Sequence, residues 1–384
     1  MKVAVVGLGV LGASAARALA GAGAEVTVFE RDAPLAGTSG TSFAWVNSHN
    51  KNPRSYHDLN VAGMAEHVAL AEDPGAHRPW LARTGNLEWA EGEGAERLAQ
   101  SVGELRARDY PVEWITPRRA RELAPDLRVP DADIAFYPTE GYLNPALLVA
   151  RLWGEARDLG ARLHRAEITA IGETPRGVRL EHAGGAHEAD AVVTATGRWT
   201  EALTATTGHR VAVADPDAAG SATVGLLGYT APLPTRLNLV LTTPGLNVRP
   251  EGGGRLVVQG LDLDAHADPA DPPATSGQHA TELCRRLDAL LEGASGARLE
   301  SFRVGQRAMP ADGLTAAGFL DDRSRIYALC THSGITLGPL LGKLAAQEVV
   351  TGAEAEQLAD FRPQRLVGAT DLPELRPARF AGQQ

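Results

Sequence analysis

Residues 3–12 read VAVVGLGVLG, an apolar run that passes directly into the glycine pattern G-x-G-x-x-G. In this pattern Gly7 permits a tight turn and Gly9 lets the backbone approach a pyrophosphate. Gly12 lets the next helix, expected over residues 13–22, pack closely on the strand. The free N–H groups at the start of that helix would point at phosphates. The stretch therefore predicts a strand-turn-helix unit that binds a dinucleotide.

A second strand and a terminal acid complete this unit. Residues 26–30 read VTVFE, so Glu30 ends the strand. The acid lies roughly 20 residues beyond the glycines, the spacing at which a carboxylate accepts the two ribose hydroxyls. A glycine-rich turn alone is a weak signal, but here every part of the unit follows in order. Because the acid disfavours a 2′-phosphate, we expect FAD or NAD and not NADP.

Composition narrows the class of protein. The chain of 384 residues exceeds the usual size of a single core, which predicts two domains. A formal net charge of −10 argues against nucleic acid or an anionic membrane as a partner. No stretch approaches the ~20 continuous apolar residues of a membrane span, and the phased glycines distinguish the first apolar run from a signal peptide. Cys284 and Cys330 have no C-x-x-C spacing, so we expect no metal site, no disulfide framework and a cytoplasmic location.

Periodicity and turn residues predict the remaining elements. The segment 31–52 is a long loop rich in Gly, Ser, Thr and Asn, and such loops are uncommon unless they have a function. Pro339 is expected at the start of the last helix, and the tail after residue 363 is expected to be loosely ordered. We expect helices over residues 56–72, 96–108, 117–123, 146–159, 281–291 and 338–350, strands at 85–90, 166–171, 178–180, 191–197 and 325–330, and a β-rich region over 223–260.

Three distant segments resemble flavoprotein signatures. Residues 190–200, DAVVTATGRWT, are similar to the second signature of glutathione-reductase-type flavoproteins. Residues 305–314, GQRAMPADGL, and 331–339, THSGITLGP, resemble the C-terminal signatures of the D-amino acid oxidase superfamily of FAD-dependent oxidoreductases. Glycine oxidase and sarcosine oxidase are the most similar types. The GTSG stretch at 37–40 also matches, and the resemblance covers nearly the whole chain, with residues 223–291 the least diagnostic.

This resemblance implies a fold and a division of the chain. The fold class is α/β, with a glutathione-reductase-type FAD-binding Rossmann domain interleaved with a smaller antiparallel-sheet substrate domain. The implied segments are 1–50, 140–215 and 300–365 for the FAD-binding domain, 51–139 and 216–299 for the substrate domain, and 366–384 for a C-terminal tail.

The resemblance also implies how the flavin is held. The turn at 333–338 and its helix should present N–H groups to the flavin pyrimidine, where negative charge develops on reduction. Some relatives attach flavin covalently to histidine or cysteine, but His49 lies in no recognisable attachment motif, so we expect noncovalent FAD. His332 is interpreted as a structural turn residue. Besides Gly7, Gly9, Gly12 and Glu30, the implied cofactor-binding residues are Arg31, Ser39, Thr41, Ser42, Ile168, Gly197, Gly334, Ile335, Thr336 and Leu337.

Four basic residues are candidates for the substrate site. In the family, the arginine of the G-x-R segment pairs bidentately with the substrate carboxylate, and here that arginine is Arg307. The alternative interpretation is that Arg307 is a surface arginine without a role in binding. Lys51 is one of three lysines and lies in the long loop. It is expected to bind a second carboxylate or to promote electron transfer to O2, unless it is a solvated loop residue. Arg249 and His49 are further candidates, although structural pairing is favoured for Arg249.

The reaction implied is oxidation of a C–N bond in a small amino acid or N-substituted glycine. A hydride leaves the carbon next to the amine for flavin N5, and the resulting imine hydrolyses. O2 or another acceptor then takes the electrons. Two alternatives stay open at this point: an NAD-linked dehydrogenase, which the C-terminal signature disfavours, and a non-catalytic FAD-binding redox protein.

Overall fold

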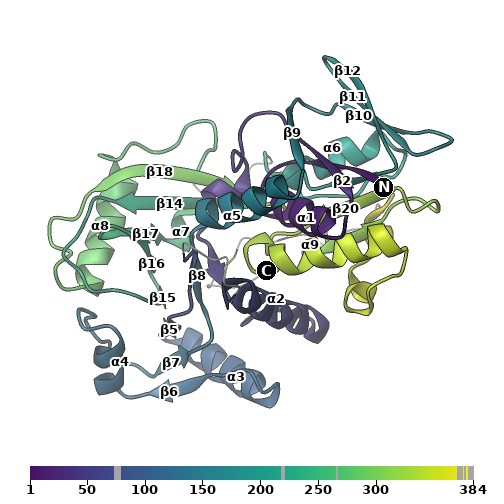
Figure 1. Ribbon diagram of the computed structural model, residues 1–384. Coiled ribbons are helices and arrows are strands. Elements are labelled where there is room, and N and C mark those ends of the chain that lie inside the picture. The colour runs from purple at the N-terminus through teal and green to yellow at the C-terminus, as the bar shows by residue number, and fades with distance from the viewer. Residues whose placement is uncertain (73–78, 218–220, 265–266, 370–374, 376–377, 379–384) are drawn as a thin grey trace.

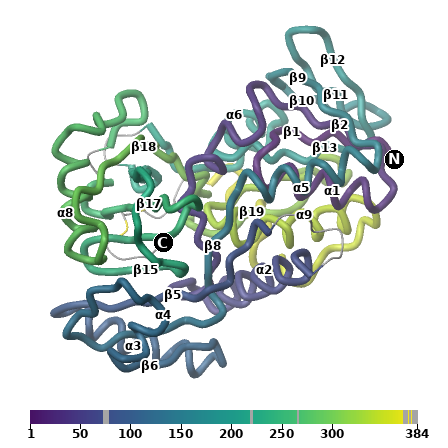
Figure 2. Tube along the Cα trace, turned by 60° about the vertical axis from the view of Figure 1, so that its left-hand side comes forward, coloured from purple at the N-terminus to yellow at the C-terminus, as the bar shows by residue number. Residues whose placement is uncertain are grey.

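The computed structural model describes residues 1–72, 79–217, 221–264 and 267–369, together with residues 375 and 378. Two large sheets, one of six strands and one of eight, lie on opposite sides of the molecule (Figure 1). The chain passes between them several times, so each side is built from stretches that are distant in sequence (Figure 2). None of the helices in the described part of the chain has the length and apolar character needed to span a bilayer.

The six-stranded sheet contains the strand of the glycine turn. Its order is β19-β20-β13-β1-β2-β9, and every neighbouring pair is parallel except β19 with β20. A mostly parallel sheet with β1 near its centre confirms the predicted Rossmann-type fold class. Its strands are β1 (Lys2–Val6), β2 (Glu25–Glu30), β9 (Arg162–Arg165), β13 (Ala191–Thr194), β19 (Ala316–Phe319) and β20 (Ile326–Cys330).

Both faces of this sheet are covered. Because side chains alternate along a strand, Val3 and Val5 pack into one core while Ala4 and Val6 pack into another. The first core lies under three helices, α1 (Val10–Gly21), α5 (Pro145–Asp158) and α9 (Gly334–Thr351). The second lies under the short helix α6 (Thr200–Ala205) and a three-stranded antiparallel sheet of β10 (Ala170–Glu173), β11 (Val178–His182) and β12 (Gly185–Ala189).

The eight-stranded sheet is mostly antiparallel, with the order β18-β14-β17-β16-β15-β5-β7-β6. Its β5 and β15 pair in parallel. The helices α4 (Pro117–Leu123) and α8 (Gln278–Leu290) bury Ala120, Leu283 and Leu287 in the same core as its strands. The strands are β5 (Asn86–Glu88), β6 (Glu113–Ile115), β7 (Ile134–Tyr137), β14 (Val224–Thr230), β15 (Val240–Thr242), β16 (Asn247–Gly252), β17 (Arg255–Gln259) and β18 (Leu299–Gln306).

The long loop after β2 connects the two halves. The hydroxyl of Thr38 donates to the carbonyl of Gln306, at the end of β18, over 2.5 Å. Further along the loop, Trp45 pairs with Tyr142 in a small sheet of β3 (Trp45–Val46), β8 (Gly141–Leu143) and β4 (Leu81–Ala82). The other described elements are α2 (Arg54–Glu72), α3 (Glu93–Ala107), α7 (Leu261–Asp264), and the 3-10 turns η1 (Thr38–Thr41), η2 (Gly197–Trp199), η3 (Glu356–Phe361) and η4 (Pro363–Leu366).

Helix α9 starts earlier than predicted. It begins at Gly334, so Pro339 lies inside the helix, and the prediction that Pro339 opens it was wrong. Proline lacks the N–H that would bond the carbonyl four residues earlier, which here belongs to Ile335. The Nε2 of His67, on α2, lies 2.7 Å from this carbonyl oxygen and supplies the missing donor. The helix therefore tolerates the proline through a partner that is 268 residues away in sequence.

Two smaller expectations also differ from the structure. The strand predicted at 166–171 begins only at Ala170. Residues 363–366, predicted to be loosely ordered, form the 3-10 turn η4, because Leu366 is buried against the second core. Most of the predicted tail after residue 369 lies outside the described residues.

The bond from His67 predicts a pH-dependent stability. Burial lowers the pKa of His67 to about 4, whereas the pKa of an unfolded histidine is ~6.5. Between these values the unfolded chain binds a proton that the folded chain does not, so the free energy of unfolding falls as the pH falls through this window. We expect His67 to account for a loss of about 2 kcal/mol between pH 7 and pH 5.

Denaturant unfolding at pH 7 and pH 5 checks this expectation. His67→Gln keeps a donor for Ile335 but does not titrate, so it should lose less stability on acidification than the wild type. An equal loss in both proteins would show that His67 is not an acid-sensitive contact.

Candidate active site

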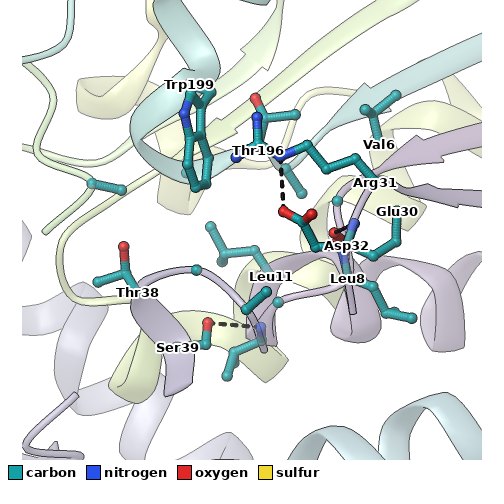
Figure 3. A pocket seen from close by; sticks show the side chains of 18 of the residues that line it. Val6, Leu8, Leu11, Glu30, Arg31, Asp32, Thr38, Ser39, Thr196 and Trp199 are labelled. Carbon is teal, nitrogen blue, oxygen red and sulfur yellow. Dashed lines mark hydrogen bonds and ion pairs between the residues drawn. The ribbon is translucent and has the colours of Figure 1, made fainter. Parts of the chain in front are cut away.

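A cleft of about 380 Å³ runs along the carboxyl ends of β1, β2 and β13. Figure 3 shows Glu30, Ser39 and Trp199 around it, from three separate segments of the chain. The cleft lies at the carboxyl ends of parallel strands, where open α/β sheets bind their ligands.

The glycine turn has the geometry that close approach to a ligand requires. Gly7 has a φ of +99°, a left-handed conformation that favours glycine. A Cβ on Gly12 would lie 1.9 Å from the carbonyl oxygen of Gly7, so only glycine allows α1 to pack this closely on the turn. A Cβ on Gly9 would lie 2.9 Å from Ser39 Oγ. The N-terminus of α1 lines the cleft at Gly9, Val10 and Leu11, where the N–H of Val10 donates to Ser39 Oγ at 3.1 Å. A helix N-terminus in this position favours an anion such as a pyrophosphate.

The carboxylate of Glu30 already accepts two hydrogen bonds from backbone N–H groups. Its Oε2 accepts a hydrogen bond from the N–H of Leu8 at 2.8 Å, and its Oε1 accepts one from the N–H of Asp32 at 3.0 Å. A carboxylate has about four acceptor sites, so two bonds orient it and leave capacity for two more. That remaining capacity matches the two hydroxyls of a ribose.

A second pocket, of about 190 Å³, adjoins the cleft. The two share four lining residues, namely Thr38, Ser42, His332 and Ile335. The second pocket extends towards the eight-stranded sheet, and amide side chains from β16 and β17 line its far side. Among the described residues that line it, Lys51 and Arg307 carry charge, and there is no aspartate or glutamate. A ligand bound here would therefore meet a cationic surface next to the dinucleotide cleft.

Arg307 follows β18 and projects its guanidinium into the second pocket. Its Nη1 donates to the carbonyls of Ala222 and Val224 at 3.2 and 3.3 Å. Its Nη2 lies 3.6 Å from Asp264 Oδ2, beyond hydrogen-bond distance. Burial raises the pKa of Asp264 to about 6, and the Arg307 cation opposes this rise. The guanidinium is thus anchored on one side and keeps donors for a ligand on the other.

Lys51 is a buried side chain and not a solvated one. Only 7% of it is exposed, and it lines the second pocket. Burial lowers the pKa of Lys51 to about 8; the Glu140 carboxylate opposes this shift, and the Arg307 cation adds to it. At pH 7 most molecules therefore carry a charged ammonium next to Arg307.

Arg249 and His49 lie outside both pockets. Arg249 is buried and donates to the carbonyl of Pro250 at 2.8 Å, and it also bonds the carbonyl of Phe43 and the carboxylate of Glu251. His49 is buried too, with its Nδ1 2.8 Å from Glu140 Oε1. The structure therefore does not place these two residues in the pocket lining with Arg307 and Lys51, although Lys51 and His49 are close enough for their charges to interact.

Comparison with known proteins identifies the family. A family model described as FAD dependent oxidoreductase matches residues 2–348. The chain belongs to this family. The match spans both large sheets, the cleft and all of the second pocket except Ala378, and it supports an FAD-dependent enzyme over an NAD-linked one.

Relatives of this flavoprotein extend over nearly its full length. Glycine oxidase from Geobacillus kaustophilus (strain HTA426) is 28% identical over 380 residues, which cover 95% of this chain and 97% of the relative. A crystal structure of glycine oxidase from Geobacillus kaustophilus has a TM-score of 0.82 and 26% identity, covering 96% of this chain and all of that one. The bifunctional tRNA 5-methylaminomethyl-2-thiouridine biosynthesis protein MnmC of Thiobacillus denitrificans is 28% identical over 402 residues, and the match spans 95% of this flavoprotein and 59% of that protein.

The chemistry of the cleft fits FAD. It combines a close-packed glycine turn, a helix N-terminus and an acid with free acceptor capacity. Thr41 and Thr336 line the second pocket instead, and Gly12 and Leu337 are buried behind the lining. The predicted cofactor residues that line the cleft are Gly7, Gly9, Glu30, Arg31, Ser39, Ser42, Ile168, Gly197, Gly334 and Ile335.

Removal of the Glu30 carboxylate should weaken FAD binding. Glu30→Ala deletes the oriented acceptor at the end of β2, and hydrogen bonds to a charged group contribute ~1.5–3 kcal/mol. We therefore expect FAD affinity to fall by about 10- to 100-fold. Titration of apoprotein with FAD measures this, and Glu25→Ala, an exposed acid at the other end of β2, is the matched control. Equal affinity in Glu30→Ala and wild type would count against the assignment.

Several polar residues of the second pocket carried no sequence signal. Asn247 and Gln259 come from β16 and β17, and Asn47 comes from the long loop. Asp264, which approaches Arg307, lies at the end of the short helix α7. These residues belong to no motif, and only the folding of the eight-stranded sheet against the loop brings them together.

Proposed function

We propose that this flavoprotein oxidises the C–N bond of a small amino acid or N-substituted glycine. The observation that carries the proposal is the junction between the cleft at the glycine turn and a small pocket that contains Arg307. Bound FAD supplies the acceptor for a hydride from the substrate carbon next to the amine. The substrate becomes an imine, which water converts into a carbonyl compound and a free amine.

The residues of this chain act mainly by positioning the substrate. Arg307 binds the carboxylate, and the carbonyls of Ala222 and Val224 fix the plane of its guanidinium. Burial lowers the pKa of His332 well below its usual range, and the positive charges of Lys51 and Arg307 make smaller contributions in the same direction. His332 thus stays neutral between the two pockets and adds no third positive charge there. The N-terminus of α9 faces the cleft at Gly334 and Ile335, where its N–H groups favour developing negative charge.

We also propose that FAD is bound noncovalently. His49, the histidine considered for attachment, is enclosed between Glu140 and Tyr137 and does not line the cleft. Acid precipitation of the purified protein should therefore leave FAD in the supernatant.

The predicted division into an FAD-binding and a substrate domain is a proposal as well. The membership of most strands in the two large sheets supports it. Several segments lie with the opposite half. Among them, β18 is part of the eight-stranded sheet, and α2 and α3 contribute to the core that contains α9. The cytoplasmic location, the absence of a nucleic-acid partner and the choice between O2 and another electron acceptor stay predictions.

Product analysis tests the proposed reaction. The purified flavoprotein is incubated with glycine, sarcosine and D-alanine in the presence of an artificial electron acceptor, and the carbonyl product is trapped and quantified. We expect one carbonyl product per two electrons transferred. Acceptor reduction without a carbonyl product would contradict oxidation of a C–N bond.

A further inference from the structure

We infer that the substrate of the second pocket is a small amine with two carboxylates, one bound by Arg307 and the other by Lys51. This inference rests on the proposed function, because it names the substrate class of the same site. It follows from the charges of the pocket, from the absence of an ion pair to Lys51 among the described residues, and from the unpartnered amide oxygen of Asn47.

The lining of the pocket is cationic. Lys51 and Arg307 are its charged residues among those described, and the other lining side chains are apolar, hydroxyl, amide or imidazole groups. Asp264 lies 3.6 Å from Arg307 and Glu140 acts on Lys51 from longer range, but neither carboxylate lines the pocket. Two cations at one pocket favour anionic ligands. An amine with one carboxylate would give one of the two cations a direct partner, whereas a dicarboxylate gives a direct partner to both.

Lys51 has a charged ammonium group whose direct partner is not found among the described residues. In the described part of the chain, no carboxylate forms an ion pair with its ammonium, although Glu140 acts on it at longer range. The oxygens of Glu140 are engaged elsewhere. Its Oε1 accepts from the hydroxyl of Tyr110 at 2.7 Å and faces His49, and its Oε2 accepts from Trp45 Nε1 at 3.1 Å. A carboxylate of the ligand would be the direct partner of Lys51.

A side chain of the same pocket offers an acceptor for the amine. Asn47 lines the pocket with Lys51 and Arg307, and its buried Oδ1 has no hydrogen-bond partner among the described residues. A buried polar atom without a partner is costly. An N–H of the substrate amine would satisfy it, with the two carboxylates on Arg307 and Lys51. The pocket volume of about 190 Å³ is below the ~300 Å³ at which sites for drug-sized ligands begin, so the ligand is small.

Binding of inert probes to the FAD-loaded protein tests the inference without catalysis. Malonate and succinate are compared with acetate and propionate by calorimetry and by the change in flavin absorbance. We expect the dicarboxylates to bind about 30- to 100-fold more tightly than the monocarboxylates. Lys51→Met should reduce this ratio to about threefold or less, and Lys51→Arg, which keeps the charge, should retain most of it.

A matched control separates the pocket from general charge effects. Lys343 is an exposed lysine on α9 that pairs with Glu66, and Lys343→Met removes the same charge outside the pocket. The ratio in this variant should equal that of the wild type. A wild-type ratio near one, or a ratio that Lys51→Met leaves unchanged, would overturn the inference.

Flavin reduction under anaerobic conditions provides the second test. Iminodiacetate is compared with sarcosine, and D-aspartate with D-alanine, in the wild type and in Lys51→Met. For each pair, the preference is the ratio of the flavin-reduction rate constants with the dicarboxylic and the monocarboxylic amine at limiting concentration. We expect this ratio to exceed one for at least one pair in the wild type and to fall by about 30-fold or more in Lys51→Met. If Lys51→Met slows only the reoxidation of flavin by O2, the inference is wrong.

The two tests distinguish this inference from the proposed function. Reduction by monocarboxylic amines with no dicarboxylate preference would overturn the inference and leave the proposed function intact. If no amine reduces the flavin, the proposed function fails, and the probe ratio still decides whether the pocket recognises two carboxylates.

Discussion

Arg307→Ala is expected to lower the rate constant for flavin reduction by substrate, at limiting substrate concentration, by at least about 100-fold, with FAD still bound. The truncation removes the anchored guanidinium, which lines the second pocket and not the FAD cleft. It also leaves the buried carboxylate of Asp264 without its nearby cation. Loss of one partner from a desolvated charge pair, here the guanidinium that binds the substrate carboxylate, costs ~2–5 kcal/mol, so the effect on substrate affinity should exceed that of most surface substitutions.

Matched variants make this prediction specific. Arg303 lies on the same strand, is exposed and contacts the ring of Tyr229, so Arg303→Ala removes an arginine from β18 outside the pocket. Arg307→Lys keeps the charge but loses the planar fork, and its effect should lie between those of Arg307→Ala and wild type. Stopped-flow reduction over a range of substrate concentrations measures all three. Wild-type kinetics in Arg307→Ala would show that this arginine has no part in substrate binding.

Gly12→Ala is expected to yield protein with little or no FAD. A Cβ at this position would lie 1.9 Å from the carbonyl oxygen of Gly7, so either α1 or the glycine turn must move. Overpacking of this kind costs ~1–3 kcal/mol or more, and here the displaced atoms are backbone atoms of the cofactor turn. The ratio of flavin to protein absorbance after purification reports the loss.

Another glycine of the same helix is the control for this variant. Gly21 lies near the end of α1, and a Cβ there would meet no atom within 4 Å. Gly21→Ala should therefore retain FAD and be at least as stable as the wild type, because alanine favours helix. Full FAD occupancy in Gly12→Ala would contradict the proposed packing of the turn.

Local signals made the cofactor cleft predictable from sequence. Residues 3–30 contain the strand, the glycines and the terminal acid within one unit, and each depends on near neighbours. Pro339 shows the limit of such reasoning, because the carbonyl that it leaves without a donor is satisfied by His67 from another helix. The start of α9 thus depended on a tertiary contact that no local pattern contains.

The substrate pocket was only partly predictable. The family resemblance indicated Arg307, and the scarcity of lysine in the chain indicated Lys51. Both residues line the second pocket. The same reasoning also selected Arg249 and His49, which bind carbonyl and carboxylate groups elsewhere. Residue type and loop position do not reveal the direction of a side chain. Asn47 belongs to no motif, and its place in the pocket depends on how the loop packs against the eight-stranded sheet. Its role could therefore not be predicted from the sequence.

Anaerobic reduction of the bound flavin tests the proposed amine oxidation most directly. The FAD-loaded protein is mixed without oxygen with single amino acids and secondary amines, including the dicarboxylic ones, and the visible absorbance of the flavin is followed. We expect at least one of these amines to bleach the flavin completely, with a rate that saturates as its concentration rises and that falls in Arg307→Ala. A flavin that stays oxidised with every amine, although dithionite reduces it fully, would contradict the proposed function.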